Sequence, residues 1–379
     1  MRIGSSIPDE GIPLRSTGQA EEGWRQWLAL HAAPRRQTLG GEGLLVAVIA
    51  AVAFVVTERG TVFSLDVATQ FGLFTILVAS LQLMLGYSNQ ASLAQGALYG
   101  VGAYLSAYME VHSHVPVGLV CVSSVAAGML CGVVIAVPLA RLREHFLVLA
   151  TLAIQVMATT LFTNLFSVTG GSNGEAVPLA HVGSLGLLYV ILGVDLAVLI
   201  VLRRLTSTRA GRRLLAVKAD ETMAASVGVN GRVVRAAAVV VAFGMASGAG
   251  FLFSESSGFV APSDFSLTVS LSVLVAVVVG GSSITWGTLV GAGAYSILQA
   301  ESTSFPGLSV LILGVFLVVV LGYFPKGLTG LARDGLRLVT GSGPSSHALL
   351  GIHATGPAKP GGAGEPIGVG GVVANEEPV

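Results

Sequence analysis

The chain has 379 residues, of which 53% are hydrophobic and 11% are charged, and its mean hydropathy is +0.80. Soluble globular domains carry roughly 25% charged residues, so this composition excludes that class and predicts an integral membrane protein. The 20 Lys and Arg balance the 20 Asp and Glu, which gives no sign of a nucleic-acid partner, and we expect none.

The two ends of the chain are polar. Residues 1–42 contain Pro, Gly, Ser and charges of both signs, too long and too polar a stretch for the n-region of a cleaved signal peptide, so we expect a cytoplasmic tail. Residues 331–379 are rich in Gly, Pro and Ser from Gly341 onward and cannot bury enough apolar surface to fold. We expect them to form a mostly disordered cytoplasmic tail, with a membrane domain over residues 43–330 between the two.

Apolar runs within this domain are long enough to cross a bilayer core, which needs about 20 helical residues. They cover residues 43–57, 62–86, 94–110, 116–139, 146–168, 186–202, 234–254, 265–281, 284–300 and 306–324. This predicts an all-α, polytopic bundle of about ten transmembrane helices. Because several runs are short, eight to eleven spans stay open, and one pair could instead form a re-entrant hairpin.

The basic residues predict the orientation of the bundle. With the N-terminus inside, the loops near residues 87, 141, 203–233, 282 and 325 are cytoplasmic, and only Arg59 falls outside. The residues on the cytoplasmic side are Arg35, Arg36, Arg141, Arg143, Arg203, Arg204, Arg209, Arg212, Arg213, Lys218, Arg232, Arg235, Lys326, Arg333 and Arg337. Both termini are then cytoplasmic.

A polar stretch follows the second predicted span. It consists of Ser88, Asn89, Gln90, Ser92 and Gln95. In lipid an unpaired amide or hydroxyl group is costly, so these side chains either form a cytoplasmic turn or line a wet cavity. Ser92, Gly96 and Gly100 then recur every four residues, a pattern that lets another helix approach closely and could shape a pathway.

The segment from Val168 to Gly186 is predicted to be an external loop. It contains Gly170, Gly171, Ser172, Asn173 and Gly174, residue types that favour turns with exposed backbone amides. Such amides could receive a carboxylate, although an ordinary connecting loop explains the composition equally well.

Ionisable residues inside the predicted spans are candidates for function. Asp66 falls at an outer edge, where water can reach it, whereas Asp195 falls near the middle of a span and could be a proton relay or a structural partner of another helix. His112 and His114 have no third ligand at a recognisable metal spacing, so we expect no metal site. Without an HExxH motif or a visible nucleophile and base, an enzyme is disfavoured.

Residues 203–235 form the most informative polar segment. Leu214, Leu215, Val217, Met223, Ala224 and Val227 give a moderately amphipathic helical pattern, which Gly228 and Asn230 are suited to end. The helix either lies on the bilayer surface or docks in a partner subunit. Because the chain has no GxxxxGK[ST] sequence, it cannot supply a P-loop nucleotide site of its own.

Four segments, in order, resemble motifs of the LivM-type permease subunits of bacterial ABC importers for branched-chain amino acids. "LMLGYSNQASLAQGALYGVGAY" is similar to that family's GY-x-GQ-x-SLG stretch, and "ARLREHFLVLATLA" with "NLFSVTGGSNG" is similar to its LRLR…TLA and LTGGPNG segments. "GRRLLAVKADETMAASVGVN" resembles the cytoplasmic coupling motif, and the stretch from "GFVAPSDFS" to "WGTLVGA" resembles the late SPSDFS…WGP region. The likeness covers residues 65–330. The departures from the pattern are Gln82, Ala94, Gln95, Glu144 and Thr288.

The resemblance implies an inner-membrane importer built from two permeases, two cytosolic ABC ATPases and an extracytoplasmic binding protein. This chain would be one permease, a transport subunit that binds lipid around it and no cofactor, since the partner subunits use the ATP. Arg212, Glu221, Ala224 and Gly228 would couple it to an ATPase, and the polar stretch with the Gly170–Gly174 loop would border the translocation pathway.

The sequence is also compatible with two other functions. The same machinery could import urea, short amides or another small carboxylate, because the binding protein usually sets the cargo and two departures fall in the polar stretch. An ion-coupled secondary transporter or channel that uses Asp195 is the other alternative.

Overall fold

A computed structural model describes residues 62–302, apart from residues 114, 140–143, 178–182, 206–207 and 282–283. The predicted spans 43–57 and 306–324 and both predicted tails lie outside the described residues. The other predicted spans lie within them.

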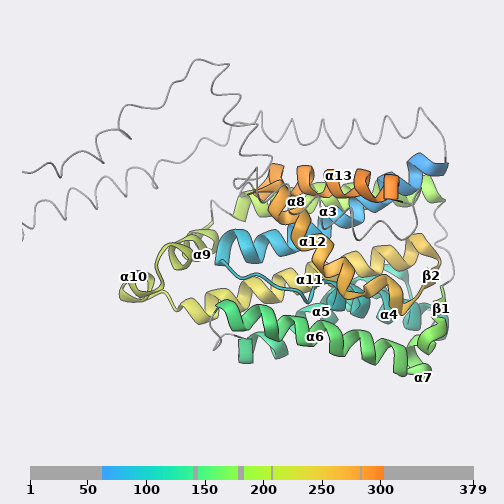
Figure 1. Cartoon of the computed structure of the whole chain (residues 1–379), viewed down its shortest axis with the longest axis horizontal. Helices are drawn as coiled ribbons and strands as arrows, with labels where there is room; N and C mark the ends of the chain where they lie inside the picture. Colours follow the sequence, from blue (N-terminus) through green and yellow to red (C-terminus); the bar gives the residue numbers. More distant parts are fainter. Residues whose placement is uncertain are drawn as a thin grey trace, which may run out of the picture. The chain divides into compact units, whose positions relative to one another are not determined.

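The described part of the chain is mostly helical (Figure 1). Its longer helices are α3 (Val62–Ser88), α4 (Gln95–His112), α5 (Val117–Leu139), α6 (Glu144–Asn164), α8 (Ser184–Leu205), α11 (Gly231–Ser257), α12 (Leu267–Gly280) and α13 (Ile284–Ser302). Shorter elements are α7 (Phe166–Thr169), α9 (Arg209–Ala219), α10 (Glu221–Ser226) and the 3₁₀ turns η1 (Gly171–Asn173) and η2 (Pro262–Phe265). Two short strands, β1 (Glu175–Ala176) and β2 (Phe259–Val260), pair antiparallel and are the exception to the predicted all-α class.

Five of the described helices, α3, α5, α6, α8 and α11, are long and apolar enough to cross a membrane. The helix α12 is apolar but shorter, with 14 residues. Each of these helices covers a predicted span, so the prediction of a helical protein with several membrane-crossing segments is confirmed. The prediction of ten spans stays a prediction, because two of them lie outside the described residues and the helices α4, α12 and α13, which match three others, are not among these five.

The core forms where α11 packs against α3, α4 and α5, and α3 packs in addition against α8, α12 and α13. The helices α4 and α11 meet through glycine on both sides. A Cβ atom at Gly102 would lie 1.9 Å from the carbonyl oxygen of Ser247, and one at Gly250 would lie 1.9 Å from that of Tyr99. The two backbones therefore touch, as small residues permit between membrane helices.

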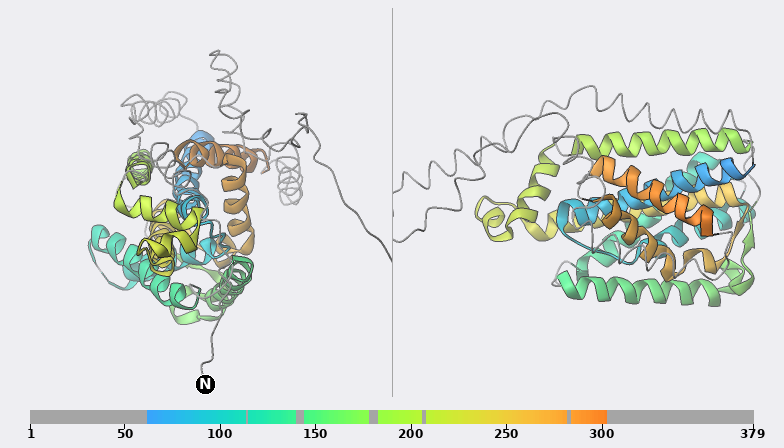
Figure 2. Two further views of the ribbon diagram at one scale, coloured as in Figure 1. Left: turned by 90° about the vertical axis from the view of Figure 1, so that its left-hand side faces the viewer. Right: turned by 45° about the horizontal axis from the view of Figure 1, so that its top comes forward.

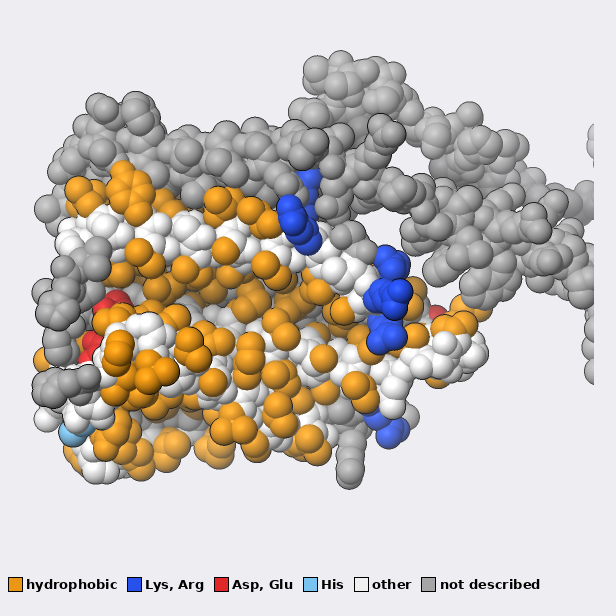
Figure 3. Space-filling view, turned by 180° about the vertical axis from the view of Figure 1, so that it is seen from behind, with side chains coloured by type: hydrophobic (Ala, Val, Ile, Leu, Met, Phe, Trp, Pro, Cys, Tyr) orange, Lys and Arg blue, Asp and Glu red, His pale blue; other side chains and the backbone are white. Residues whose placement is uncertain are grey.

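The two ends of the bundle differ in structure and charge. The helices α9 and α10 project from one end, called the basic end here, and β1 and β2 lie at the other, called the strand end (Figures 1 and 2). Figure 3 shows Lys and Arg side chains gathered at the basic end and acidic side chains at the strand end. On the face that Figure 3 shows, the side chains between the two ends are mostly hydrophobic or uncharged, as expected of a surface that faces lipid.

Candidate translocation pathway and coupling helices

The polar stretch re-enters the bundle as non-helical chain. The helix α3 ends at Ser88, and Asn89 reverses the chain with a φ of 54°, the only positive φ at a described residue other than glycine. From Asn89 to Ala94, called the re-entrant segment here, the chain runs back between the helices before α4 begins (Figure 1). Asn89 is exposed, whereas Gln90 and Ser92 are buried. Non-helical backbone at membrane depth is tolerated only where protein covers it or water reaches it.

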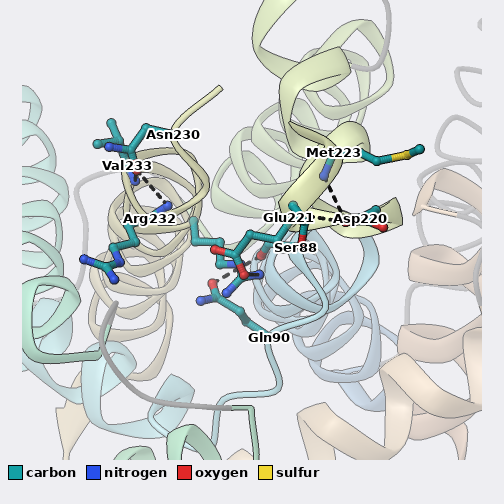
Figure 4. A network of polar contacts seen from close by, with 10 residues as sticks. Ser88, Gln90, Asp220, Glu221, Met223, Asn230, Arg232 and Val233 are labelled. Atoms are coloured by element: carbon teal, nitrogen blue, oxygen red, sulfur yellow. Dashed lines mark hydrogen bonds and ion pairs between the residues drawn. The ribbon is translucent and has the colours of Figure 1, made fainter. Parts of the chain in front are cut away.

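The start of the re-entrant segment is held at the basic end. The hydroxyl of Ser88 donates to the carbonyl oxygen of Met84 at 2.7 Å and lies 3.2 Å from the amide oxygen of Gln90, a pair that Figure 4 shows in close-up. The Nζ of Lys218, the last basic residue of α9, donates to the carbonyl oxygen of Gly86 at 2.7 Å. The end of α3 is therefore tied to α9.

The start of α4 is capped by side chains of other helices. The first N–H groups of a helix have no acceptor within it. Here the backbone N–H of Gly96 donates to Ser270 Oγ at 2.8 Å, and that of Ala97 donates to Gln155 Oε1 at 2.6 Å. Gln95 Oε1 accepts from Ser80 Oγ at 3.0 Å. These bonds bring α3, α6 and α12 to one point.

Sequence reasoning missed the α6 and α12 members of this network. Thr151, Gln155 and Ser270 are all fully buried, and Thr151 Oγ1 accepts from the backbone N–H of Leu93 at 3.0 Å. One signal was available, because Thr151, Gln155 and Thr159 recur every four residues in an apolar run and so share one face of a helix. Such a row indicates contact with protein rather than with lipid.

An aromatic cluster lies between the start of α4 and the strand end. It consists of Tyr99, Tyr104, Phe162, Phe253 and Phe265, with the ring of Phe265 5.3 to 6.1 Å from each of the other four. Gly100 makes room for it, since a Cβ atom there would lie 2.5 Å from the Phe162 ring. Gly96 is similarly close to polar atoms, with its Cβ position 2.9 Å from Ser270 Oγ.

The predicted external loop folds into a tight turn at the strand end. Gly170, Gly171 and Gly174 have φ values of 69°, 66° and 72°, which favour glycine, while Ser172 and Asn173 are exposed. The sequence GGSNG fits the pattern G-x-S-x-G, but Ser172 lies in η1 between α7 and β1 instead of on the strand-to-helix turn that presents a serine nucleophile. This loop and the re-entrant segment do not come together, because the loop lies at the strand end, whereas the segment enters from the basic end (Figure 1).

Two helices form where one amphipathic helix was predicted. The pattern is broken at Asp220, whose backbone is extended and whose carboxylate accepts from the N–H groups of Thr222 and Met223 at 2.7 and 3.0 Å (Figure 4). Asp220 thus ends α9 and caps α10. Gly228, with a φ of 81°, follows α10, whereas Asn230 starts α11 instead of ending a helix.

The four predicted coupling residues play different parts. Arg212 and Gly228 are exposed, whereas Ala224 is buried against the chain. Glu221 pairs with Arg235 of α11 at 2.7 Å, which fixes α10 to the start of that helix. The large exposed apolar side chains here are those of Met223 in α10, at 56% exposure, and of Val227 at its C-terminal cap, at 69%.

Asp195 lies buried within α8. It is 1% exposed, and neither carboxylate oxygen has a hydrogen-bond partner among the described residues. A Cβ atom at Gly72 of α3 would lie 3.0 Å from Asp195 Oδ2. The carboxyl group therefore sits in the α3–α8 interface, while Asp66 is exposed as expected. No group of three His, Cys, Asp or Glu that could hold a metal occurs within the described ranges.

Comparisons with known proteins agree with the sequence motifs. The family described as "Branched-chain amino acid transport system / permease component" matches residues 63–321, more than half of the chain. The chain is 28% identical over 340 residues to the "High-affinity branched-chain amino acid transport system permease protein LivM" of Escherichia coli (strain K12), covering 80% of this chain and 78% of that protein. The protein of the same name from Salmonella typhimurium (strain LT2) gives the same identity and coverage. No solved structure gives a significant match.

Proposed function

Since the chain belongs to the family of permease components of branched-chain amino acid transport systems, we propose that it forms the membrane pathway of an ATP-driven ABC importer. The cargo is a branched-chain or similar small hydrophobic amino acid. The chain is a transport subunit of a multi-subunit system rather than an enzyme. It works with a second homologous permease, two cytosolic ABC ATPases and an extracytoplasmic binding protein, and it needs no cofactor of its own.

The observation that carries this proposal is the buried re-entrant segment. A bundle built only for anchoring has no need to bury non-helical backbone, because a continuous helix satisfies its own hydrogen bonds. A segment held by side chains of α6 and α12 can move when those contacts change. We assign the pathway to Ser88, Asn89, Gln90, Ser92, Gln95, Gly96 and Gly100, with the Gly170–Gly174 turn at its outer mouth.

Coupling to the ATPase runs through α9 and α10. The exposed Met223 and Val227 offer an apolar contact to a groove of the ATPase. From there one path leads through the Glu221–Arg235 pair to α11, and a second leads through Lys218 to the end of α3, next to the re-entrant segment. Closure of the ATPases on ATP would move both helices together and shift the balance between outward-open and inward-open states.

The positions of the charges support the predicted orientation. The basic end lies in the cytoplasm of a bacterium, where α9 and α10 can reach a soluble ATPase, and the strand end faces the extracytoplasmic binding protein. The full domain comprises about ten spans over residues 43–330, with both tails, 1–42 and 331–379, in the cytoplasm.

Co-purification from native membranes tests this function. Affinity isolation of the tagged chain should bring with it a protein with a P-loop sequence and ATPase activity. Met223→Glu places a charge on the exposed apolar face of α10 and should reduce the recovered ATPase at least about tenfold, while Leu215→Glu, on the exposed side of α9, should leave most of it. Isolation of the wild-type chain without any ATPase would contradict the proposal.

A further inference from the structure

A single side chain of α6 binds the start of α4 and the end of η2 at once. Gln155 Oε1 accepts from the backbone N–H of Ala97 at 2.6 Å and from Ser270 Oγ at 3.0 Å. Gln155 Nε2 donates to the carbonyl oxygen of Phe265 at 2.7 Å and lies 3.3 Å from Thr159 Oγ1. The amide thereby uses both lone pairs and both N–H groups, and it is fully buried.

The two parts that Gln155 joins come from opposite ends of the bundle. Ala97 lies in the first turn of α4, directly after the re-entrant segment that enters from the basic end. Phe265 ends η2, which follows β2 at the strand end, and its ring lies at the centre of the aromatic cluster. One amide therefore connects the first turn of α4, which directly follows the re-entrant segment, to the residue at the centre of the aromatic cluster.

The helix α6 contacts these parts through polar side chains as well as through the buried ring of Phe162. Its opposite face is apolar and exposed, as Leu149, Val156, Met157 and Leu161 show. Toward the bundle, Thr151 and Gln155 bind the backbone at Leu93 and Ala97, one helical turn apart. Hydrogen bonds of this kind are directional and are lost over small displacements, so a small movement between α6 and the start of α4 would break them.

We propose that Gln155 is a latch that keeps the re-entrant segment and the aromatic cluster closed together. The inference rests on the proposed function, in which the re-entrant segment borders the pathway; here that segment is the inner barrier, and the aromatic cluster, which lies toward the strand end, is the outer barrier. A buried amide that loses one partner is left with an unpaired polar group, so opening either barrier weakens the hold on the other. The latch thus resists opening until nucleotide-driven movement of α3 and α11 pulls the start of α4 away from α6. Gln155 acts here as a positioning residue.

The test uses the purified full complex with Cys121→Ser and Cys131→Ser, and with Ser92→Cys as a reporter in the re-entrant segment. Ser92 is fully buried, so a water-soluble maleimide should label the reporter slowly. Gln155→Met keeps the size of the side chain but removes its hydrogen bonds, and it should raise the labelling rate at least about fivefold, since several buried hydrogen bonds are lost together. It should also lower the amount of cargo taken up per ATP hydrolysed.

Two further variants make the result decisive. Thr160→Val removes a hydroxyl of α6 that bonds only to its own helix at Val156 O, and it should change neither quantity. Gln155→Asn keeps the amide on a shorter stem that cannot reach Ala97 and Phe265 together, and it should behave like Gln155→Met. If position 155 needed only a polar side chain, Gln155→Asn would instead give the labelling rate and the uptake per ATP of the unsubstituted protein.

Each outcome decides the inference. Labelling and coupling in Gln155→Met and Gln155→Asn equal to those in Thr160→Val would overturn it. Failure of both Gln155 variants to accumulate, while Thr160→Val accumulates, would also overturn it, because Gln155 would then serve folding. The labelling needs no transport, so lack of ATP-dependent uptake by the wild-type complex would count against the proposed function alone.

Discussion

Gly102 of α4 and Gly250 of α11 set how closely two central helices approach. Each Cβ position would lie 1.9 Å from a carbonyl oxygen of the facing helix, so any side chain there must push the helices apart. Overpacking of this kind typically costs about 1–3 kcal/mol. Since α11 contacts most of the core, the cost should appear as lower stability of the whole bundle.

We therefore expect Gly250→Ala to lower the thermal unfolding midpoint of the purified protein, measured by the loss of its monodisperse chromatographic peak after heating. The matched control is Gly193→Ala in α8, where a Cβ atom would meet nothing within 4 Å and the midpoint should not fall. Equal midpoints for the two variants would show that the α4–α11 contact is less tight than described.

Individual polar residues were only partly predictable from the sequence. Ser92 and Gln95 stood out because polar groups are costly in lipid. Gln155 and Ser270 did not stand out, because the role of one amide or hydroxyl in an apolar run depends on which group of another helix it contacts. The partners here are backbone N–H groups of α4, which a helical pattern cannot place.

At the level of the helices, an ion pair between Glu221 and Arg235 joins α10 to α11. Both groups are partly exposed, and such a pair contributes about 0.2–1 kcal/mol, which corresponds to at most about fivefold in a conformational equilibrium. Its effect should therefore be seen in the efficiency of transport rather than in folding.

We expect Glu221→Arg to reduce cargo uptake per ATP hydrolysed by about two- to fivefold, because α10 then moves without α11. The double variant Glu221→Arg with Arg235→Glu restores the pair in reverse and should recover most of the loss. A double variant no better than the single one would show that the pair does not transmit the movement.

The limits of prediction for elements have a physical cause. The long helices α3, α5, α8 and α11 begin and end within a few residues of the predicted runs, because apolar length dominates there. The division between α9 and α10 was missed because Asp220 resembles an ordinary exposed acid until its side chain is seen to cap the next helix. The sequence does not decide whether the re-entrant segment forms a cytoplasmic turn or lines a cavity, because the side chains that cover it come from α6 and α12, which are far away in the sequence.

At the scale of the whole molecule, the basic end and the strand end predict which side each loop faces. The exposed Ser226 lies in α10, and the exposed Ser172 lies in the glycine-rich turn. In a background with Cys121→Ser and Cys131→Ser, an impermeant maleimide applied to spheroplasts should label Ser172→Cys and not Ser226→Cys. Inverted membrane vesicles should give the opposite pattern. Labelling of Ser226→Cys in spheroplasts would show that the orientation is the reverse of the predicted one.

In the proposed function, ATP hydrolysis by a partner is transmitted through α10 and drives transport through this chain. The most direct measurement is uptake of radiolabelled leucine into proteoliposomes that contain the co-purified complex and an excess of its binding protein, at equal ion concentrations on both sides. We predict uptake that requires ATP and the ATPase, that is lost when residues 221–226 are deleted and that an imposed proton gradient does not replace. Uptake by the purified chain alone, driven by a proton gradient and abolished by Asp195→Asn, would contradict the account.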